Sequence, residues 1–308
     1  MLNNHSKWEK LGRIAMASEN IWWMKTWTGP SFLANNGNGP VFDIYLTGRD
    51  DQNRSRIGRA RINLEAAQPV FDIEPEPLLD LGELGCFDEN GVSYPVITRN
   101  KGRDFMYYVG WMPSVLTPFL NFPGLAIKND ETGTFERYSR VPVLERTNEE
   151  PFSIGSVFVM EDDNRWKMWY TSFLKWGEGN EHLHYYVIRY AESDDGIDWN
   201  RTGKICINIE NETEYAICKP CVIKRGGIYH MWYTYRGAQY RIGYAVSEDG
   251  ISWTRRDDLV GINVSDSGWD SEAMSYPHVV EYGGYLYMIY CGNQYGKEGI
   301  GLARLPLK

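Results

Sequence analysis

The sequence predicts an all-β protein: a single five-bladed β-propeller with four-stranded antiparallel blades around a central channel. Three observations lead to this prediction. One strand pattern recurs five times along the 308 residues, aromatic residues make up 14% of the chain, and no segment shows sustained helical periodicity. Aromatic residues favour strands, and five copies of one aromatic strand in register are unusual in the main alternative, a β-sandwich.

Each copy of the repeat opens with a polar loop and a short apolar strand. A Gly/Asp turn, an aromatic strand and a third strand of the form I-G-x-A follow. In the clearest copy, Gly226 and Gly227 supply the positive φ that a tight turn needs. The copies lie at residues 30 to 65, 94 to 127, 155 to 199, 218 to 253 and in the tail. Their third strands have signatures near Gly58, Gly124, Arg189, Gly243 and Gly301.

The ends of the repeat array predict how the chain is organised. The fifth copy stops after three strands, so residues 6 to 24 are expected to supply its missing outer strand. No linker divides the chain, and residues 1 to 308 are therefore expected to form one domain. Two S-x-D-G-x-x-W strings, at residues 193 to 199 and 247 to 253, are expected to form hairpins whose Trp packs between blades. Their aspartates are not catalytic candidates.

Charge and cysteine content narrow the function classes. The formal net charge is -9, and an acidic surface repels phosphate backbones, so no nucleic-acid partner is expected. No stretch approaches the roughly 20 apolar residues that span a bilayer, and the N-terminus lacks the apolar region of a signal peptide. Five scattered cysteines include a C-x-x-C at Cys218 and Cys221, which we interpret as packed free thiols. These features together predict a cytoplasmic protein.

Acidic residues precede the first strand in four of the five copies. Counting back six or seven positions from these strands gives Asp88, Glu150 with its neighbour Glu149, Glu214 and Asp270. The innermost strand of a blade starts beside the channel, so these carboxylates are expected to converge on one centre. A protonated and an ionised carboxylate together are what glycoside hydrolysis requires. The alternative is that the acids cap loops or hold a cation in the channel.

Further side chains are expected to face the same cavity and bind substrate. Aromatic residues can stack on sugar rings, and Arg can bind a carboxylate or phosphate in bidentate fashion. These candidates are Arg49, Tyr94, Trp111, Lys219, Arg236, Glu272, His278 and Asn293. The alternative for the Trp is packing between blades, and a buried structural role explains His278 equally well.

Several of these strings resemble a known superfamily. FDENGV-x-YP, MWYT-x-x, IGYA-x-SEDG-x-SW and GWDSE-x-x-x-YP are similar to motifs of the five-bladed glycosidases, which include arabinanases, xylosidases, invertases, levansucrases and mannoside phosphorylases. The resemblance covers nearly the whole chain. It implies three acids from successive blades as catalytic groups, and Asp88 and Glu214 match their types and positions best, with Glu150 and Asp270 as further candidates. The first copy departs from the pattern, because it has neither the Asp of many relatives nor the Asn-Asp-Pro-Asn string of invertases.

The leading functional prediction is a glycoside hydrolase-like enzyme that acts on a small or activated sugar in surface-glycan metabolism. Glu214 is predicted as general acid and Asp88 as base or nucleophile, with Glu150 or Asp270 tuning them. The alternatives are a sugar phosphorylase or other transferase, and a non-catalytic carbohydrate-binding propeller. No metal-ligand set is predicted, although the carboxylates could hold a Ca²⁺ in the channel. Aromatics at residues 111 to 122 and 173 to 186 predict either a homodimer contact or a lid.

Overall fold

The structure, a computed structural model, describes residues 2, 6–66, 69–177 and 183–307. Nearly all of its regular structure is β-strand. The helices of the described residues are two 3-10 turns, Trp22–Met24 and Asp257–Leu259, and the short α1, Asn293–Gly296. Within the same residues, no helix has the length and apolar character needed to cross a membrane.

The strands of the described chain fall into five antiparallel groups, in each of which neighbouring strands are hydrogen-bonded. The first strands of groups 1 to 5 are β3 (Phe32–Asn38), β7 (Val92–Asn100), β11 (Ile154–Asp162), β15 (Ala216–Arg225) and β19 (Ser275–Tyr282). The second strands are β4 (Val41–Arg49), β8 (Arg103–Pro113), β12 (Arg165–Trp176), β16 (Ile228–Arg236) and β20 (Tyr285–Cys291). The third strands are β5 (Ser55–Asn63), β9 (Phe119–Lys128), β13 (His184–Ser193), β17 (Tyr240–Ser247) and β21 (Ile300–Pro306).

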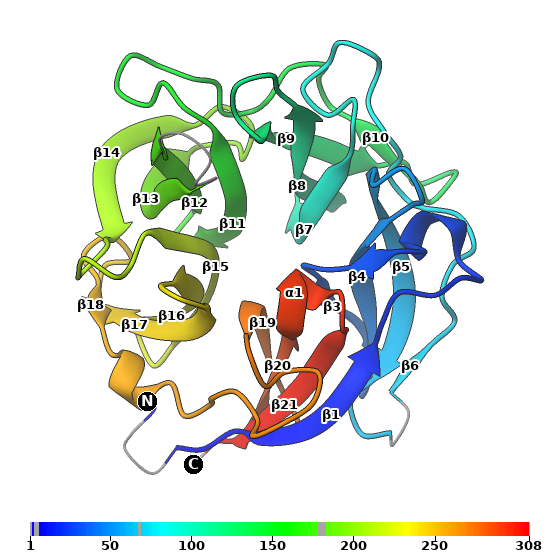
Figure 1. The fold of residues 1–308 in the computed structure, drawn as a ribbon, viewed down its shortest axis with the longest axis vertical. Helices are drawn as coiled ribbons and strands as arrows, with labels where there is room; N and C mark the ends of the chain where they lie inside the picture. Colours follow the sequence, from blue (N-terminus) through cyan, green and yellow to red (C-terminus); the bar gives the residue numbers. More distant parts are fainter. Residues whose placement is uncertain (1, 3–5, 67–68, 178–182, 308) are drawn as a thin grey trace.

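The fourth strands are short in three of the groups. They are β6 (Val70–Phe71), β10 (Phe135–Arg137), β14 (Asn200–Ile207), β18 (Thr254–Arg255) and, for group 5, β1 (Glu9–Ala15). β1 pairs antiparallel with β21, which confirms that the N-terminal segment supplies the strand missing from the last copy. In Figure 1 the groups surround a common centre, with first strands such as β7, β11 and β19 near it and fourth strands such as β14 and β18 at the periphery.

Two short connections add to this arrangement. Groups 3 and 4 belong to one hydrogen-bonded sheet, because a single parallel pair joins Tyr186 of β13 to Ala216 of β15. In group 1, the two-residue strand β2 (Trp27–Thr28) pairs with the end of β4. β4 therefore pairs with two strands that precede it in the chain, first β2 and then β3. The pairing with β2 places the side chain of Trp27 beside Arg49 at the end of β4.

The glycine of the I-G-x-A signature lets a tyrosine ring lie flat over the third strand. Gly124 is paired with Tyr108 of the second strand, and Gly243 is paired with Tyr233. A Cβ on either glycine would meet the ring of its tyrosine at 2.4 Å, which is far inside van der Waals contact. The signature therefore marks the position where the second-strand tyrosine crosses towards the fourth strand.

Aromatic side chains fill the space between neighbouring groups. Trp253, from the second S-x-D-G-x-x-W turn, packs against Trp169 of group 3, with ring centroids 6.1 Å apart. Trp199 packs against Tyr107 of group 2, also with ring centroids 6.1 Å apart. Both turns therefore have the packing role predicted for them. The five cysteines are free thiols and four of them are buried, as the sequence predicts.

Candidate functional site

The first strands carry a bulge where they approach the centre of the molecule. The ladder register shifts between Ser93 and Val96 in group 2, and at the corresponding places in groups 3, 4 and 5. In three of these bulges, Tyr94, Lys219 and Tyr276 adopt φ of 55°, 51° and 57°. Each precedes a proline, which disfavours the helical conformation at that position, and a left-handed φ in a bulky residue costs of order 1–3 kcal/mol. Such strain is typical of functional sites.

Hydroxyl groups bind the backbone amides that the bulges release from the ladder. Thr47 accepts a hydrogen bond from the Tyr94 amide at 3.3 Å, and Ser156 accepts one from the Lys219 amide at 2.9 Å. Thr234 accepts from the Tyr276 amide at 2.7 Å. Since each hydroxyl belongs to the preceding group, these bonds fix both the bulge and the junction between groups.

A central pocket with a volume of about 430 Å³ lies where the bulges meet. All five groups contribute to its wall. Its aromatic lining residues are Trp27, Tyr94, Trp111, Phe119, Phe173, His184, Tyr186, Tyr240, Tyr276 and Tyr295, and its polar ones include Arg49, Asn53, Ser93, Asn121, Ser156 and Thr171. The described lining residues include no Asp or Glu.

The pocket combines one cation with several neutral hydroxyls. Arg49 lies between two indoles, with its guanidinium carbon 4.7 Å from the Trp27 ring and 5.4 Å from the Trp111 ring. Burial lowers the pKa of Arg49, while burial raises the pKa of Tyr94 and Tyr276. The tyrosine hydroxyls are therefore protonated at neutral pH, and each can both donate and accept a hydrogen bond.

The predicted acids lie elsewhere, in a recurring cluster of a second-strand tyrosine, a carboxylate and a fourth-strand cation. In group 2, the Tyr108 hydroxyl donates to Asp88 at 3.0 Å, and Arg137 of β10 pairs with the same carboxylate at 2.7 Å. In group 5, Asp270 accepts from Tyr290 at 3.0 Å and pairs with Lys10 of β1 at 2.7 Å. We call this arrangement the tyrosine–carboxylate–cation cluster.

Group 4 forms the same cluster with two carboxylates. Tyr233 donates to Asp257 at 2.6 Å, and Arg255 of β18 binds both Asp257 and Glu214, the latter with two hydrogen bonds of 2.7 and 2.8 Å. Burial by itself would raise the pKa of Glu214, but the hydrogen bonds from Arg255 and the Glu210 amide outweigh it and the pKa is lowered. A general acid requires the opposite shift.

The pKa of Asp270 responds to its surroundings in the same way. Burial would raise it, but hydrogen bonds from Lys10, Ser265 and Tyr290 outweigh the burial, so that the pKa is lowered. Asp270 is therefore ionised at neutral pH. Its charge is balanced by Lys10 within group 5.

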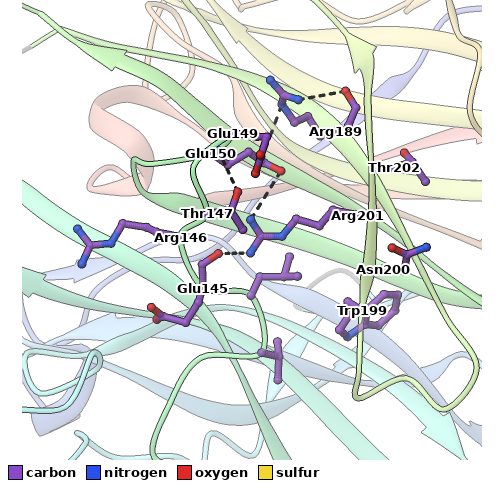
Figure 2. Close-up of a pocket in the computed structure, with 13 residues that line it drawn as sticks. Glu145, Arg146, Thr147, Glu149, Glu150, Arg189, Trp199, Asn200, Arg201 and Thr202 are labelled. Carbon is purple, nitrogen blue, oxygen red and sulfur yellow. Dashed lines mark hydrogen bonds and ion pairs between the residues drawn. The ribbon is translucent and has the colours of Figure 1, made fainter.

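Glu150 lies farther from its cations than the other three acids do. Tyr170 and Ser172 donate to its two oxygens at 2.8 and 2.6 Å. Arg201 and Arg189 lie 3.6 and 3.9 Å away, and Figure 2 shows both beside this carboxylate. Arg189 occupies the position at which the other third strands have glycine. Glu150, Arg189 and Arg201 border a second pocket of about 590 Å³. Glu149, Arg146 and Trp199 also line it (Figure 2).

The structure does not bring the four predicted acids together in the central pocket. Six or seven extended residues span roughly 20 Å, so a loop of that length reaches from a first strand to the periphery. There the fourth-strand cations bind the carboxylates. The prediction that the carboxylates converge on the channel did not allow for the length of these loops. The catalytic roles of the acids stay a prediction.

The other predicted residues divide between the pocket and its surroundings. Arg49, Tyr94 and Trp111 line the central pocket. The guanidinium carbon of Arg236 lies 5.0 Å from the ring of Tyr240, in the pocket wall. Lys219 is fully buried next to Cys218, another wall residue.

Two of the predicted residues have structural contacts instead, and the side chain of a third points to solvent. The Nδ1 atom of His278 accepts from the Leu33 amide at 3.1 Å, and burial lowers the pKa of this imidazole far below its usual range. The Asn293 side chain accepts from the amides of Glu272 and Ala273, and so holds the loop before β19. The Glu272 side chain is exposed.

Sequence reasoning missed several pocket residues, although one signal was present. Tyr276 precedes Pro277 as Tyr94 precedes Pro95, so alignment on the proline identifies it. Residues from the third strands, such as Tyr186 and Tyr240, have no comparable signal. Among the described residues, no cluster of three or more His, Cys, Asp or Glu side chains is placed to bind a metal ion such as Ca²⁺.

Two curated proteins of Mycobacterium tuberculosis match the chain along almost its whole length. The one named uncharacterized protein MT1551, from strain CDC 1551 / Oshkosh, is 40% identical over 301 residues, or 97% of this chain and 99% of the relative. Uncharacterized protein Rv1502, from strain ATCC 25618 / H37Rv, is 39% identical with the same coverage. The chain belongs to the family of these two mycobacterial proteins. No protein-family model matches the sequence.

Solved structures of glycoside hydrolases share the fold of this chain. One glycoside hydrolase aligns with a TM-score of 0.76 at 18% identity, over 96% of this chain and 90% of its own. A thermostable family-43 glycoside hydrolase aligns with a TM-score of 0.66 at 17% identity, over 96% and 91%. A structure from the GH130 family of mannoside phosphorylases aligns with a TM-score of 0.71 at 14% identity, over 97% and 93%. The resemblance to this superfamily is thereby confirmed for the fold.

Proposed function

We propose that the chain is a five-bladed β-propeller that binds a carbohydrate in its central pocket. In this proposal the five groups of strands are the blades, and β1 completes the last of them. The single observation that carries the proposal is the composition of the pocket wall. Aromatic rings from all five groups surround a cavity of about 430 Å³, within the range typical of small-molecule sites.

The polar groups of the wall match the hydroxyls of a sugar. The Asn121 Oδ1 atom and the Arg49 Nε atom have no hydrogen-bond partner in the described part of the chain, and both residues line the pocket. Unpaired buried polar atoms are rare in folded proteins and call for a partner. Sugar hydroxyls donate and accept, while the apolar faces of sugar rings stack on aromatic side chains. A sugar therefore satisfies both kinds of surface at once.

The ion pairs of three of the four acids support sugar binding over hydrolysis by paired carboxylates. Asp88, Glu214 and Asp270 each pair with a cation at about the distance of a strong hydrogen bond. The pKa of Glu214 and of Asp270 is lowered, so neither is poised to donate a proton at neutral pH. These acids fit the role of links between the first-strand loops and the outer strands.

Calorimetric titration with a panel of sugars and glycosides tests the proposal. We expect binding by the wild-type protein, with at least a tenfold loss of affinity in Trp111→Ala. Trp199→Ala is the matched control, because it removes an equally half-buried indole from the pocket beside Glu150. Equal loss in both variants, or no binding by the wild type to any sugar of the panel, would contradict the proposal.

A second candidate function is turnover of the bound sugar by a glycoside hydrolase-like enzyme that acts on a small or activated sugar. The fold likeness to glycoside hydrolases favours it, and one of those relatives belongs to a family of mannoside phosphorylases. Release of reducing sugar that depends on Asp88 and Glu214 would assign hydrolysis. Turnover that depends on inorganic phosphate would assign a phosphorylase, and binding without turnover would assign a binding protein.

The location and assembly of the protein complete the proposal. We assign it to the cytoplasm, which the free thiols support because a reducing compartment preserves them. A homodimer stays a prediction. Val115 and Leu116, at the tip of the loop between β8 and β9, are 97% and 96% exposed and are the residues that a dimer contact would cover. Light scattering of the wild type and of a Val115→Ser, Leu116→Ser variant tests it.

A further inference from the structure

The cations around the central pocket differ from two other cations of the chain in having no carboxylate partner among the described residues. Arg56 and Arg255, which are both almost fully buried, pair with carboxylates at 2.7 Å or less. Arg49, Lys219 and Arg236 form no ion pair with any described carboxylate. Each has a buried nitrogen that finds no hydrogen-bond partner among the residues that the structure describes: Nε in the two arginines and Nζ in the lysine.

These three cations approach the pocket from two groups, Arg49 from group 1 and both Arg236 and Lys219 from group 4. Arg49 comes from the end of β4 and lines the pocket between Trp27 and Trp111. Arg236 comes from the end of β16, and its guanidinium carbon lies 5.0 and 5.8 Å from the rings of two wall residues, Tyr240 and Tyr295.

Lys219 approaches from the bulge of β15. Its backbone is held at φ 51°, and its side chain is fully buried beside the wall residue Cys218. Burial raises the pKa of the Cys218 and Cys291 thiols, and the positive charge of Lys219 opposes that rise. The lysine therefore adds positive charge directly behind the pocket wall.

Unpaired cations destabilise a protein where they are buried. Lys219 is fully buried and Arg49 and Arg236 are half-buried, whereas carboxylates satisfy the charges of Arg56 and Arg255. An anionic ligand would supply the missing counter-charge. Carboxylate and phosphate suit the planar guanidinium especially well, because both can accept two parallel hydrogen bonds from it.

Building on the proposed carbohydrate-binding function, we propose that the sugar bound in the central pocket carries an anionic group, a carboxylate or a phosphate, that contacts Arg49. Arg236 and Lys219 surround the same pocket and stabilise the anion through their positive potential. The aromatic wall holds the sugar ring. The ligand class is thus an acidic sugar: a uronic acid or a sugar phosphate.

Matched pairs of methyl glycosides and sugar phosphates test this inference by calorimetry. Methyl glucoside is compared with methyl glucuronide, and mannose with mannose 6-phosphate, at two salt concentrations. We expect the anionic member of at least one pair to bind at least tenfold more tightly, with a preference that shrinks as salt rises. Preference within the first pair assigns a carboxylate, and preference within the second assigns a phosphate.

Three variants connect the preference to the pocket. Arg49→Gln and Arg236→Gln keep a polar side chain and remove its charge, so both should reduce the preference for the anion, Arg49→Gln the more strongly. Arg103→Gln is the matched control, since Arg103 is an exposed arginine at the start of β8. The control should keep the wild-type preference.

The outcomes separate this inference from the proposed function. Equal affinity of the wild type for both members of each pair would overturn the anionic ligand and leave carbohydrate binding intact. A preference that survives Arg49→Gln would also overturn it. Absence of sugar binding altogether would overturn both.

Discussion

Tyr94, Lys219 and Tyr276 show how single residues define the centre of the molecule. All three have a left-handed backbone at a bulge next to a proline, and the two tyrosine rings lie 5.4 Å apart at the pocket wall. A conformation of this kind persists only where the surrounding structure holds it. Here a hydroxyl of the preceding group binds each bulge amide.

Lys219 gives the first prediction at this scale. Burial lowers its pKa, so at pH values between the folded-state pKa and the ordinary one the unfolded chain binds more protons than the folded chain. The folded state therefore gains stability as pH rises towards the ordinary lysine pKa of 10.5. Lys219→Met should be more stable than the wild type at pH 7 by about 1 to 3 kcal/mol, because a buried amine without a partner is removed.

Denaturant unfolding at several pH values checks the Lys219 prediction. The difference between the two proteins should narrow from pH 7 to pH 10. A variant less stable than the wild type at pH 7 would contradict the account, since it would mean that the ammonium group has a favourable partner in the ligand-free protein.

Glu214 gives the second prediction at the residue scale. Glu214→Gln removes the charge that Arg255 binds with two hydrogen bonds, so the free energy of unfolding should fall by about 1 to 3 kcal/mol. Affinity for the sugar should not change. The exposed Glu212→Gln is the matched control for both measurements. Unchanged stability together with lost turnover would instead favour the catalytic role predicted from the sequence.

The strands within a group are held together by a recurring set of side chains. The tyrosine over the signature glycine, the carboxylate of the loop and the cation of the fourth strand link the elements of one group. Group 1 departs from this plan: Leu46 is paired with Gly58, and the ring of Trp23 lies over the glycine. That substitution explains why the first copy has no acid before its first strand.

Thr234 gives a prediction at the scale of elements. Its hydroxyl is buried and binds the amide of Tyr276 at 2.7 Å, which joins β16 to the bulge of β19. Thr234→Val keeps the shape and leaves that amide without a partner, at a cost of about 1 to 3 kcal/mol. Thermal unfolding measures the loss, with the exposed Thr132→Val as control. Sugar affinity should fall as well, because the bulge positions a wall residue.

At the scale of the whole molecule, β1 joins the two ends of the chain. It pairs with β21, and Lys10 supplies the cation of the group 5 cluster. A variant lacking residues 1 to 15 exposes the edge of β21 and leaves the buried Asp270 unpaired, so it should lose at least about 3 kcal/mol of stability. The full-length variant Lys7→Gln, which changes an exposed residue, is the control. Equal denaturant midpoints for both variants would contradict this role for β1.

The whole-molecule arrangement was largely predictable from the sequence, whereas the site was predictable only in part. The repeat marks every strand group, because its turns and the I-G-x-A glycine have direct steric causes. Arg49, Tyr94 and Trp111 were identified because strand ends next to the centre face the pocket. The acids were misplaced because periodicity fixes a strand but not the path of a loop, and partners such as Arg137 and Lys10 lie far away in sequence.

A crystal structure of the protein soaked with the tightest-binding sugar of the panel locates the binding site. We expect electron density in the central pocket, with a sugar ring against Trp111 or Tyr240 and a polar contact to Arg49. Density beside Glu150 and Arg201 instead, with an empty central pocket, would contradict the proposal.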